Sequence, residues 1–392
     1  MWTRINRHRL APLAPLAPLA PLASLIAAVA LLSLAFAAGG RVRAAEDAQL
    51  SDEAFWHLIT DFSEAGGFFR FDNFISNEAL FQHVLGRLKE TTKPGGVYLG
   101  VGPDQNFTYI VALRPRIAFI VDIRRQNMLE HLMYKALIEL SADRAEFLSR
   151  LFARQRPENI GPESTPEELF KAFRNVPAEL DLFFANLDAI KLQLKQRHRF
   201  TLSTEDEASI QYIFRAFYVG GPNLTYVGPV TPRYAVRNRM PSYADLMMQN
   251  DGEGQNHSYL SSEENFGILK DLEQRNLIVP LIGDFSGPKT IRAVGTYLKQ
   301  QNAAVTVFYL SNVEQYLFQQ NDDWSRFYQN VATLPLDPNA RFIRSVFNGY
   351  AYTLRANGYF RSDSLLSSIP DLLEAFNAGR IETYYDVIRM SK

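Results

Sequence analysis

The chain has 392 residues, of which 47% are hydrophobic and 12% aromatic, so it can bury a large core in one elaborated domain or two small ones. Lys and Arg number 41 against 42 Asp and Glu, and this near-zero net charge supplies no bulk attraction for nucleic acid. Cysteine is absent, which excludes disulfides and a lipoprotein anchor.

Residues 1–44 differ from the rest and are predicted to be a secretory signal. A basic start and the low-complexity run APLAPLAPLAPLA precede LIAAVALLSLAFAA, an apolar segment too short for a comfortable membrane span. Cleavage is expected after Ala35–Ala37 or at Ala44, which predicts an exported, periplasmic protein. Two alternatives stay open. The signal can remain as an uncleaved anchor, which would be the protein's membrane contact, or the true start lies downstream and the protein is cytoplasmic.

A helix, a loop and a second helix are predicted between residues 52 and 88. Apolar positions recur there at helical spacing, Gly66 and Gly67 interrupt the pattern, and Ser76 is expected to cap the second helix. A buried strand over Val97–Val101 and another over Ile117–Asp122 then flank one helix. This spacing predicts a right-handed βαβ unit with parallel strands.

The segment from about residue 126 to 218 lacks strand patterns and contains repeated amphipathic stretches, such as PEELFKAFRNV. We expect a helical insertion over residues 141–225 within an α/β domain of residues 45–392, beside the ligand pocket. Three further strands are predicted, and helical patterns separate them: Leu277–Ile282, Val305–Leu310 and Arg341–Phe347.

Asn348-Gly349 stands between two aromatic and β-branched runs, the pattern of a hairpin with a type I′ turn. The predicted fold is therefore α/β, with a mostly parallel Rossmann-like sheet, an antiparallel C-terminal hairpin and a helical insertion.

Small residues follow the first predicted strand, where open α/β sheets bind ligands. Gly100 and Gly102 would let a ligand approach the backbone, and Asp122, at the end of the next strand, could accept hydrogen bonds from ribose hydroxyls. The alternative is structural: the glycines only make a tight turn, and Asp122 caps the next helix.

Other polar residues are expected in the same crevice. Asp284 and Asn312 follow two later strands, and Asn77 and Glu78 lie in DNFISNE, just before the sheet, from where they could reach a ligand from above. Each residue also has a local interpretation as a helix cap or turn residue.

This arrangement resembles class I S-adenosylmethionine-dependent methyltransferases. The resemblance implies that Gly100 and Gly102 cradle the methionine end of S-adenosylmethionine, that Asp122 binds its ribose and that Asp284 reads the adenine amino group. The block GVYLGVGPDQNFTYIVALRPRIAFIVDIRRQN, with SNEALFQHV upstream, also looks like a family of uncharacterised bacterial proteins with a methyltransferase-like fold.

The glycine corner departs from two known patterns. Tyr98 stands where methyltransferases have an acidic residue, and Asp104, which we also expect at the cofactor site, replaces the third glycine. Gln105 occupies the third glycine position of the dinucleotide pattern. A redox function is therefore less favoured, although Arg124 and Arg125 could contact a phosphate.

The sequence contains no motif that identifies a particular reaction. The six histidines show no zinc-binding spacing, so no metal is expected, and neither a G-x-S-x-G sequence nor a P-loop occurs. Methyl transfer needs chiefly positioning and desolvation, so catalytic residues stay unknown; Tyr109 and Glu78 are the nearest candidates for contacting an acceptor, itself unknown. The alternative function is that of an exported, non-enzymatic descendant of this fold that binds another ligand or a protein.

Overall fold

A computed structural model of the protein describes residues 48–228, 240–347 and 362–391. The predicted signal and the predicted Asn348-Gly349 turn lie outside these residues. Within the described part of the chain, no helix is long and apolar enough to cross a membrane.

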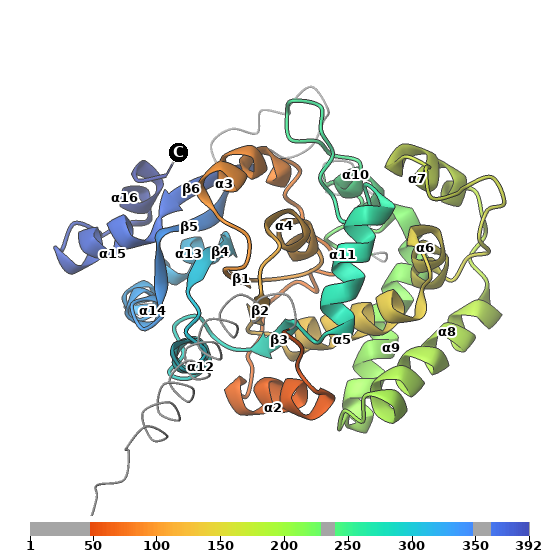
Figure 1. Ribbon diagram of the computed structural model, residues 1–392, viewed down its shortest axis with the longest axis horizontal. Coiled ribbons are helices and arrows are strands. Elements are labelled where there is room, and N and C mark those ends of the chain that lie inside the picture. Colours follow the sequence, from red (N-terminus) through yellow and green to blue (C-terminus); the bar gives the residue numbers. More distant parts are fainter. Residues whose placement is uncertain (1–47, 229–239, 348–361, 392) are drawn as a thin grey trace, which may run out of the picture. The chain divides into compact units, whose positions relative to one another are not determined.

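A six-stranded sheet of order β3-β2-β1-β4-β5-β6 forms the centre of the fold (Figure 1). The first five strands are parallel, and β6 pairs with β5 in the antiparallel direction. The strands are β1 (Val97–Gly100), β2 (Ile117–Asp122), β3 (Ile278–Ile282), β4 (Val305–Ser311), β5 (Leu336–Phe347) and β6 (Ser362–Ser368). All residues of β1, β2 and β3 are buried, as expected for parallel strands covered on both faces.

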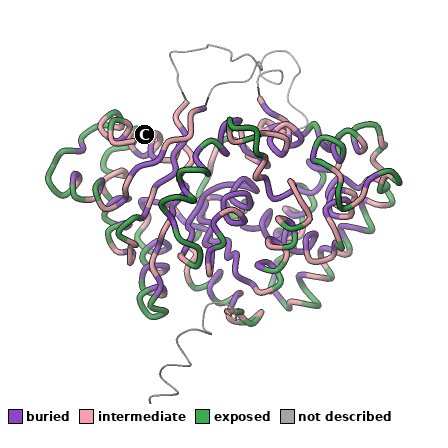
Figure 2. The backbone as a smooth tube through the Cα atoms, turned by 45° about the horizontal axis from the view of Figure 1, so that its top comes forward, coloured by how far each residue is buried: buried purple, intermediate pink, exposed green. Residues whose placement is uncertain are grey.

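The order of the strands sets the layers. The chain moves outwards from β1 through β2 to β3 and then returns to β4, so right-handed crossovers place the connecting helices on opposite faces. Figure 2 shows the resulting burial, with buried backbone in the middle of the described part and exposed backbone on the outer helices. The helices around the sheet are α2 (Asp52–Phe62), α3 (Leu85–Thr91), α4 (Gln105–Leu113), α5 (Arg125–Leu140), α11 (Glu263–Gln274), α12 (Thr290–Gln300), α13 (Val313–Leu317), α14 (Asp323–Val331), α15 (Ile369–Asn377) and α16 (Tyr384–Arg389).

A helical region lies between β2 and β3 in the sequence. It packs against α5, on the right of Figure 1. Capping boxes at Thr165 and Ser203 fix the starts of two of its helices. Its elements are α6 (Arg144–Phe152), α7 (Pro166–Arg174), α8 (Leu180–Leu192) with the π-helical turn η2 (Gln193–Arg197), α9 (Thr204–Gly220), the 3₁₀ turn η3 (Gly221–Asn223) and α10 (Tyr243–Met247).

The α/β fold with its antiparallel C-terminal pair agrees with the prediction. Phe347 pairs with Ser362, and the Asn348-Gly349 pair lies between them, outside the described residues. One local expectation was wrong: Ser76 caps no helix, and its hydroxyl accepts a hydrogen bond from the Glu78 amide in a local turn. The next helical element, the 3₁₀ turn η1 (Phe81–Val84), begins only later.

Candidate functional site

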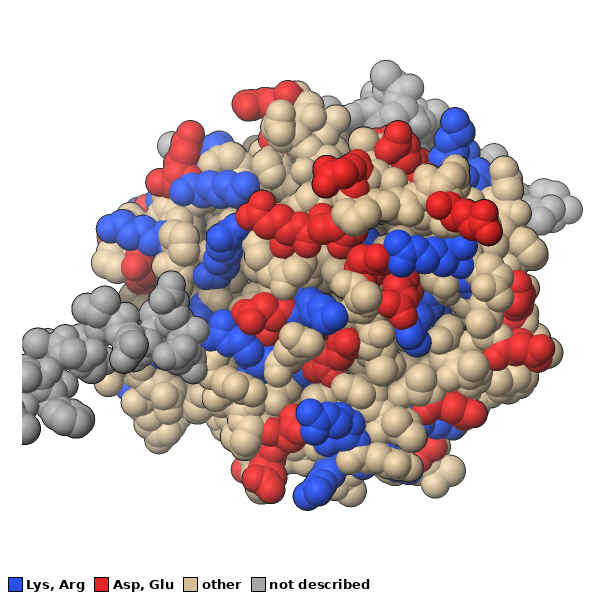
Figure 3. Space-filling view, turned by 45° about the vertical axis from the view of Figure 1, so that its right-hand side comes forward, with Lys and Arg blue, Asp and Glu red and all other residues tan. Residues whose placement is uncertain are grey.

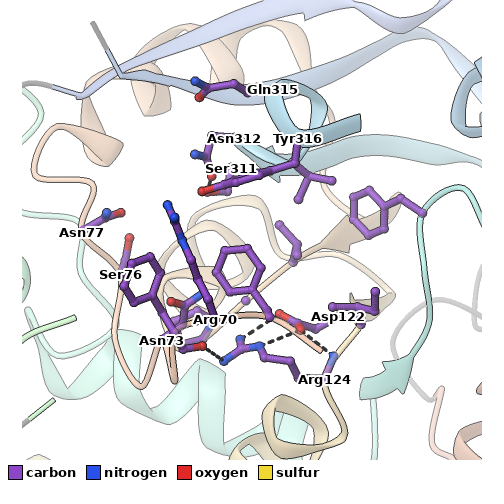
Figure 4. A pocket seen from close by; sticks show the side chains of 18 of the residues that line it. Arg70, Asn73, Ser76, Asn77, Asp122, Arg124, Ser311, Asn312, Gln315 and Tyr316 are labelled. Carbon is purple, nitrogen blue, oxygen red and sulfur yellow. Dashed lines mark hydrogen bonds and ion pairs between the residues drawn. The ribbon is translucent and has the colours of Figure 1, made fainter. Parts of the chain in front are cut away.

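A pocket of about 700 Å³ lies at the carboxyl ends of the parallel strands (Figure 4). The segments after β1, β2, β3 and β4 all contribute to its wall. The chain leaves β1 towards β2 and leaves β4 towards β5, in opposite directions along the sheet, so the pocket lies at the topological switch point of the fold, where open α/β sheets bind ligands. Its volume is typical of a small-molecule site.

The pocket brings together most of the residues singled out from the sequence. Six of the eight predicted cofactor-binding residues line it: Asn77, Glu78, Gly102, Asp122, Asp284 and Asn312. Gly100 and Asp104 are not among the residues that line it.

Gly100 is required for packing. A Cβ at this position would lie 1.9 Å from Oδ1 of Asn106 and 2.8 Å from the ring of Tyr98. The Asn106 amide occupies this space and donates to the carbonyls of Val101 and Pro103, at 2.9 and 2.7 Å. Gly100 therefore lets Asn106 fix the loop after β1.

Of the two glycines predicted at the cofactor site, Gly102 is the one that lines the pocket. Its φ of +77° is in the left-handed region that side chains disfavour, and the space that a Cβ would take is open. Nε2 of His131 lies 2.8 Å from its carbonyl oxygen. The loop after β1 thus presents backbone to the pocket.

Asp122 is held by Arg124, a contact that the sequence did not indicate. Oδ1 accepts from the amide and from Nε of Arg124, at 2.9 and 3.0 Å, and Oδ2 accepts from Nη2 at 3.0 Å. Both side chains are more than nine-tenths buried. Because a carboxylate has about four acceptor positions, Oδ2 keeps room for one more donor.

Asp104 does not point into the pocket. Although it stands at the N-cap of α4, its carboxylate makes no capping bond and instead accepts from the Tyr259 hydroxyl at 2.9 Å. Tyr259 is in turn 2.5 Å from the hydroxyl of Tyr243. Burial raises the pKa of Asp104 to about 7. The expectation that Asp104 lies at the cofactor site is therefore not supported by its position, because the network with Tyr259 draws its side chain into the interior.

Glu78 joins the N-terminal segment to the end of β4. Its carboxylate accepts hydrogen bonds from Gln105 and Tyr309, each at 2.9 Å, and from the Ser311 hydroxyl. Tyr109 is fully buried and donates to the Phe81 carbonyl, so it does not line the pocket. Of the two candidates for contacting an acceptor, only Glu78 reaches the pocket wall.

The other strand-end residues have local partners. Asp284 accepts from the amide and the hydroxyl of Ser286, at 2.9 and 3.0 Å, which is the turn arrangement expected as the local alternative. Asn312 is the N-cap residue of α13 but makes no capping bond. Its side chain lies on the pocket wall.

The segment of residues 64–78 is here named the strap. The sequence pointed only to its end, at Asn77 and Glu78, and its first part was not recognised as part of the wall. It crosses the strand ends: the Glu64 amide donates to Ile282 at 2.8 Å, the Gly67 amide to Ile123 at 2.7 Å, and the Asp72 carbonyl accepts from Arg124. Nine of its residues line the pocket: Phe68–Phe71, Asn73 and Ile75–Glu78. The letters GGFFRF show only a loop followed by aromatic residues.

Aromatic rings connect the strap to both sides of the pocket. Phe69 contacts Tyr316 of α13 at 5.5 Å between ring centroids, and Phe71 contacts Tyr226, which lies after η3 in the helical region, at the same distance. Phe69 and Phe71 themselves are 6.1 Å apart. The pocket therefore has an aromatic wall made by three segments remote in sequence.

The described residues contain no group of three His, Asp or Glu side chains placed to hold a metal ion. On the face shown in Figure 3, acidic and basic side chains are interspersed, without the continuous basic surface typical of nucleic-acid binding.

Fold and site together define a doubly wound α/β protein with a pocket at its switch point. Residues 73–219 and 224–368 match the family described as Domain of unknown function (DUF7790), and the chain belongs to that family. It matches none of the curated proteins with which it was compared.

Proposed function

We propose that the pocket binds an adenosine-type ligand, foremost S-adenosylmethionine, and that the protein is a methyltransferase-like enzyme acting on an acceptor still to be identified. The observation that carries the proposal is the convergence of four strand ends, with Gly102, Asp122 and Asp284 among them, on one pocket at the switch point.

The residues present fit such a ligand in part. The open backbone at Gly102 admits its close approach, the free acceptor position on Asp122 accepts one ribose hydroxyl, and Asp284 with Phe285 would border the base. When bound, S-adenosylmethionine would supply an electrophilic methyl group. The chain's own contribution would be to orient both reactants and exclude water, for which the strap is placed.

The pair between Asp122 and Arg124 favours a second candidate, ligand binding without methyl transfer. Arg124 occupies three of the acceptor positions of Asp122, so a ribose would find one oxygen instead of two. A protein that only binds its ligand needs no site for a methyl-accepting substrate. Turnover separates the two functions: methyl transfer from labelled S-adenosylmethionine to any extract component would identify the enzyme.

Binding is tested by calorimetric titration of the whole chain with S-adenosylmethionine, S-adenosylhomocysteine and NAD. We expect the two sulfur compounds to bind and Asn77→Trp to abolish binding, because this half-buried side chain lines the pocket and the larger ring would fill it. Gln300→Trp, at the exposed end of α12, is the matched control and should bind normally. Tight binding of NAD alone, or equal binding by the Asn77 variant, would contradict the proposal.

A further inference from the structure

Four polar side chains on the β4 side of the pocket have their hydrogen-bonding groups largely unused. Arg70 and Asn77 come from the strap, and Asn312 and Gln315 follow β4. In Figure 4, Arg70 extends across the pocket towards the side where Asn312 lies, and Asn77 borders the same space. Apart from a 3.4 Å contact between Ser311 and Asn312, no side-chain hydrogen bond within the described residues engages these four groups.

The guanidinium of Arg70 is oriented without being neutralised. Its central carbon lies 4.7 Å from the centroid of the Phe71 ring, a cation-π contact that limits its freedom. No carboxylate in the described part of the chain forms an ion pair with it. A guanidinium presents five N–H donors in a planar fork, which matches the oxygens of carboxylate and phosphate groups.

The acids on the pocket wall already have other donors. Glu78 accepts three hydrogen bonds, Asp122 is paired with Arg124, and Asp323 with Arg326. Asp284 accepts a hydrogen bond from Ser286 and follows β3, the edge strand on the other side of β1 from β4. Of the two described cations that line the pocket, Arg124 is paired with Asp122, so Arg70 is left for a ligand.

We propose that Arg70, with the amides of Asn77, Asn312 and Gln315, binds a carboxylate or phosphate group of the ligand. This oxyanion site lies on the β4 side of the pocket, and Asp122 lies after β2. The inference deepens the proposed function, on which it rests, by stating that the ligand carries an anionic group in addition to its nucleoside part.

The test compares ligands with and without the anionic group. S-adenosylhomocysteine carries a carboxylate, adenosine 5′-monophosphate carries a phosphate, and 5′-methylthioadenosine carries neither. We expect Arg70→Gln to weaken binding of one of the first two by about ten- to a hundredfold and to leave 5′-methylthioadenosine unchanged. The compound whose affinity falls shows whether the anionic group that Arg70 binds is a carboxylate or a phosphate.

Two variants control the measurement. Arg70→Lys keeps the charge but loses the fork, so it should give an intermediate affinity. Arg87→Gln, on the exposed surface of α3 and outside the pocket, should bind as the unmodified protein does. Because Arg70 is exposed and forms no ion pair with any residue that the structure describes, its variants should melt at the same temperature as the parent.

A further titration distinguishes failure of the nucleoside proposal from failure of the oxyanion site. If none of the three compounds binds, inorganic phosphate and acetate are titrated at constant ionic strength and followed by thermal shift. Stabilisation by either anion that Arg70→Gln removes would retain the oxyanion site while overturning the nucleoside ligand. Equal responses of the parent and of Arg70→Gln to every anion and nucleoside would overturn the inference.

Discussion

Asp122 lies where the sequence predicted it, on the pocket wall, but its pairing with Arg124 was not predicted. The sequence places an acid at the end of β2, and the structure has it on the pocket wall. Its partner, Arg124, could not be inferred, because a side chain two residues away can point in several directions until tertiary contacts choose one. Here the Asp72 carbonyl of the strap, which also accepts from Arg124, makes that choice.

Removing Asp122 should therefore destabilise the protein whatever it does to ligand binding. Asp122→Ala leaves the buried Arg124 without its carboxylate, which should lower the free energy of unfolding by about 3–5 kcal/mol. The double variant Asp122→Ala/Arg124→Met should recover part of this loss, because the unpaired charge is gone. Urea unfolding measures both. A single variant as stable as the parent would show that the pair is not formed.

Asp104 should make stability depend on pH. Its pKa is raised from 3.8 to about 7 in the folded protein, so the folded state binds more protons than the unfolded state between these values. Its stabilising effect is full below about pH 4 and is lost as pH rises to about 7, with a slope of up to about 1.4 kcal/mol per pH unit.

Asp104→Asn keeps an acceptor for Tyr259 and removes this titration. The variant should gain stability relative to the parent on going from pH 4.5 to pH 8. Urea unfolding at both values gives the difference, in which the contribution of the buried Glu273 cancels. The charge of Asp104 also raises the pKa of Glu130, so its removal changes the Glu130 contribution in the same direction and adds to the gain. Parallel pH profiles for the two proteins would refute the assignment.

At the scale of elements, what could be predicted follows from periodicity. Uninterrupted apolar runs predicted the parallel strands, because both faces of these strands are covered by helices. The start of β5 was missed because its first residues, from Leu336 to Asn339, are half-buried or exposed and polar in part. The first part of the strap, residues 64–71, was missed because its fold is set by bonds to strand ends and not by a local pattern.

Two glycines provide a matched test of these elements. Gly100→Ala places a methyl group where Asn106 and Tyr98 already pack, and should cost about 1–3 kcal/mol of unfolding free energy. Gly267→Ala, at an exposed position inside α11 with open space around it, should add about 0.5–1 kcal/mol. Thermal or urea unfolding of both variants checks the signs. The same sign in both would contradict this account of the β1 corner.

For the whole molecule, the class of fold was predictable and the composition of the pocket only in part. Strand ends converge in any open parallel sheet, so Gly102, Asp122, Asp284 and Asn312 could be grouped from their positions alone. Tyr226 could not, because it lies in a helical region whose placement depends on packing between helices. Arg70 could not either, since a loop arginine has no periodicity that reveals its direction.

The position of β1 has a consequence for synthesis of the chain. On one side β1 pairs with β2, which follows closely, but on the other it pairs with β4, which begins only at Val305. About 200 residues must therefore be added after β1 before its second edge is covered, which takes roughly 10–40 s at ordinary translation rates. During that interval a buried strand has an open, apolar edge, which is a template for unwanted pairing with other chains. A ribosome that stalls within the helical region would thus leave an aggregation-prone nascent chain. The pocket can form only after β4 has been synthesised and has paired with β1, because residues after β4 make part of its wall.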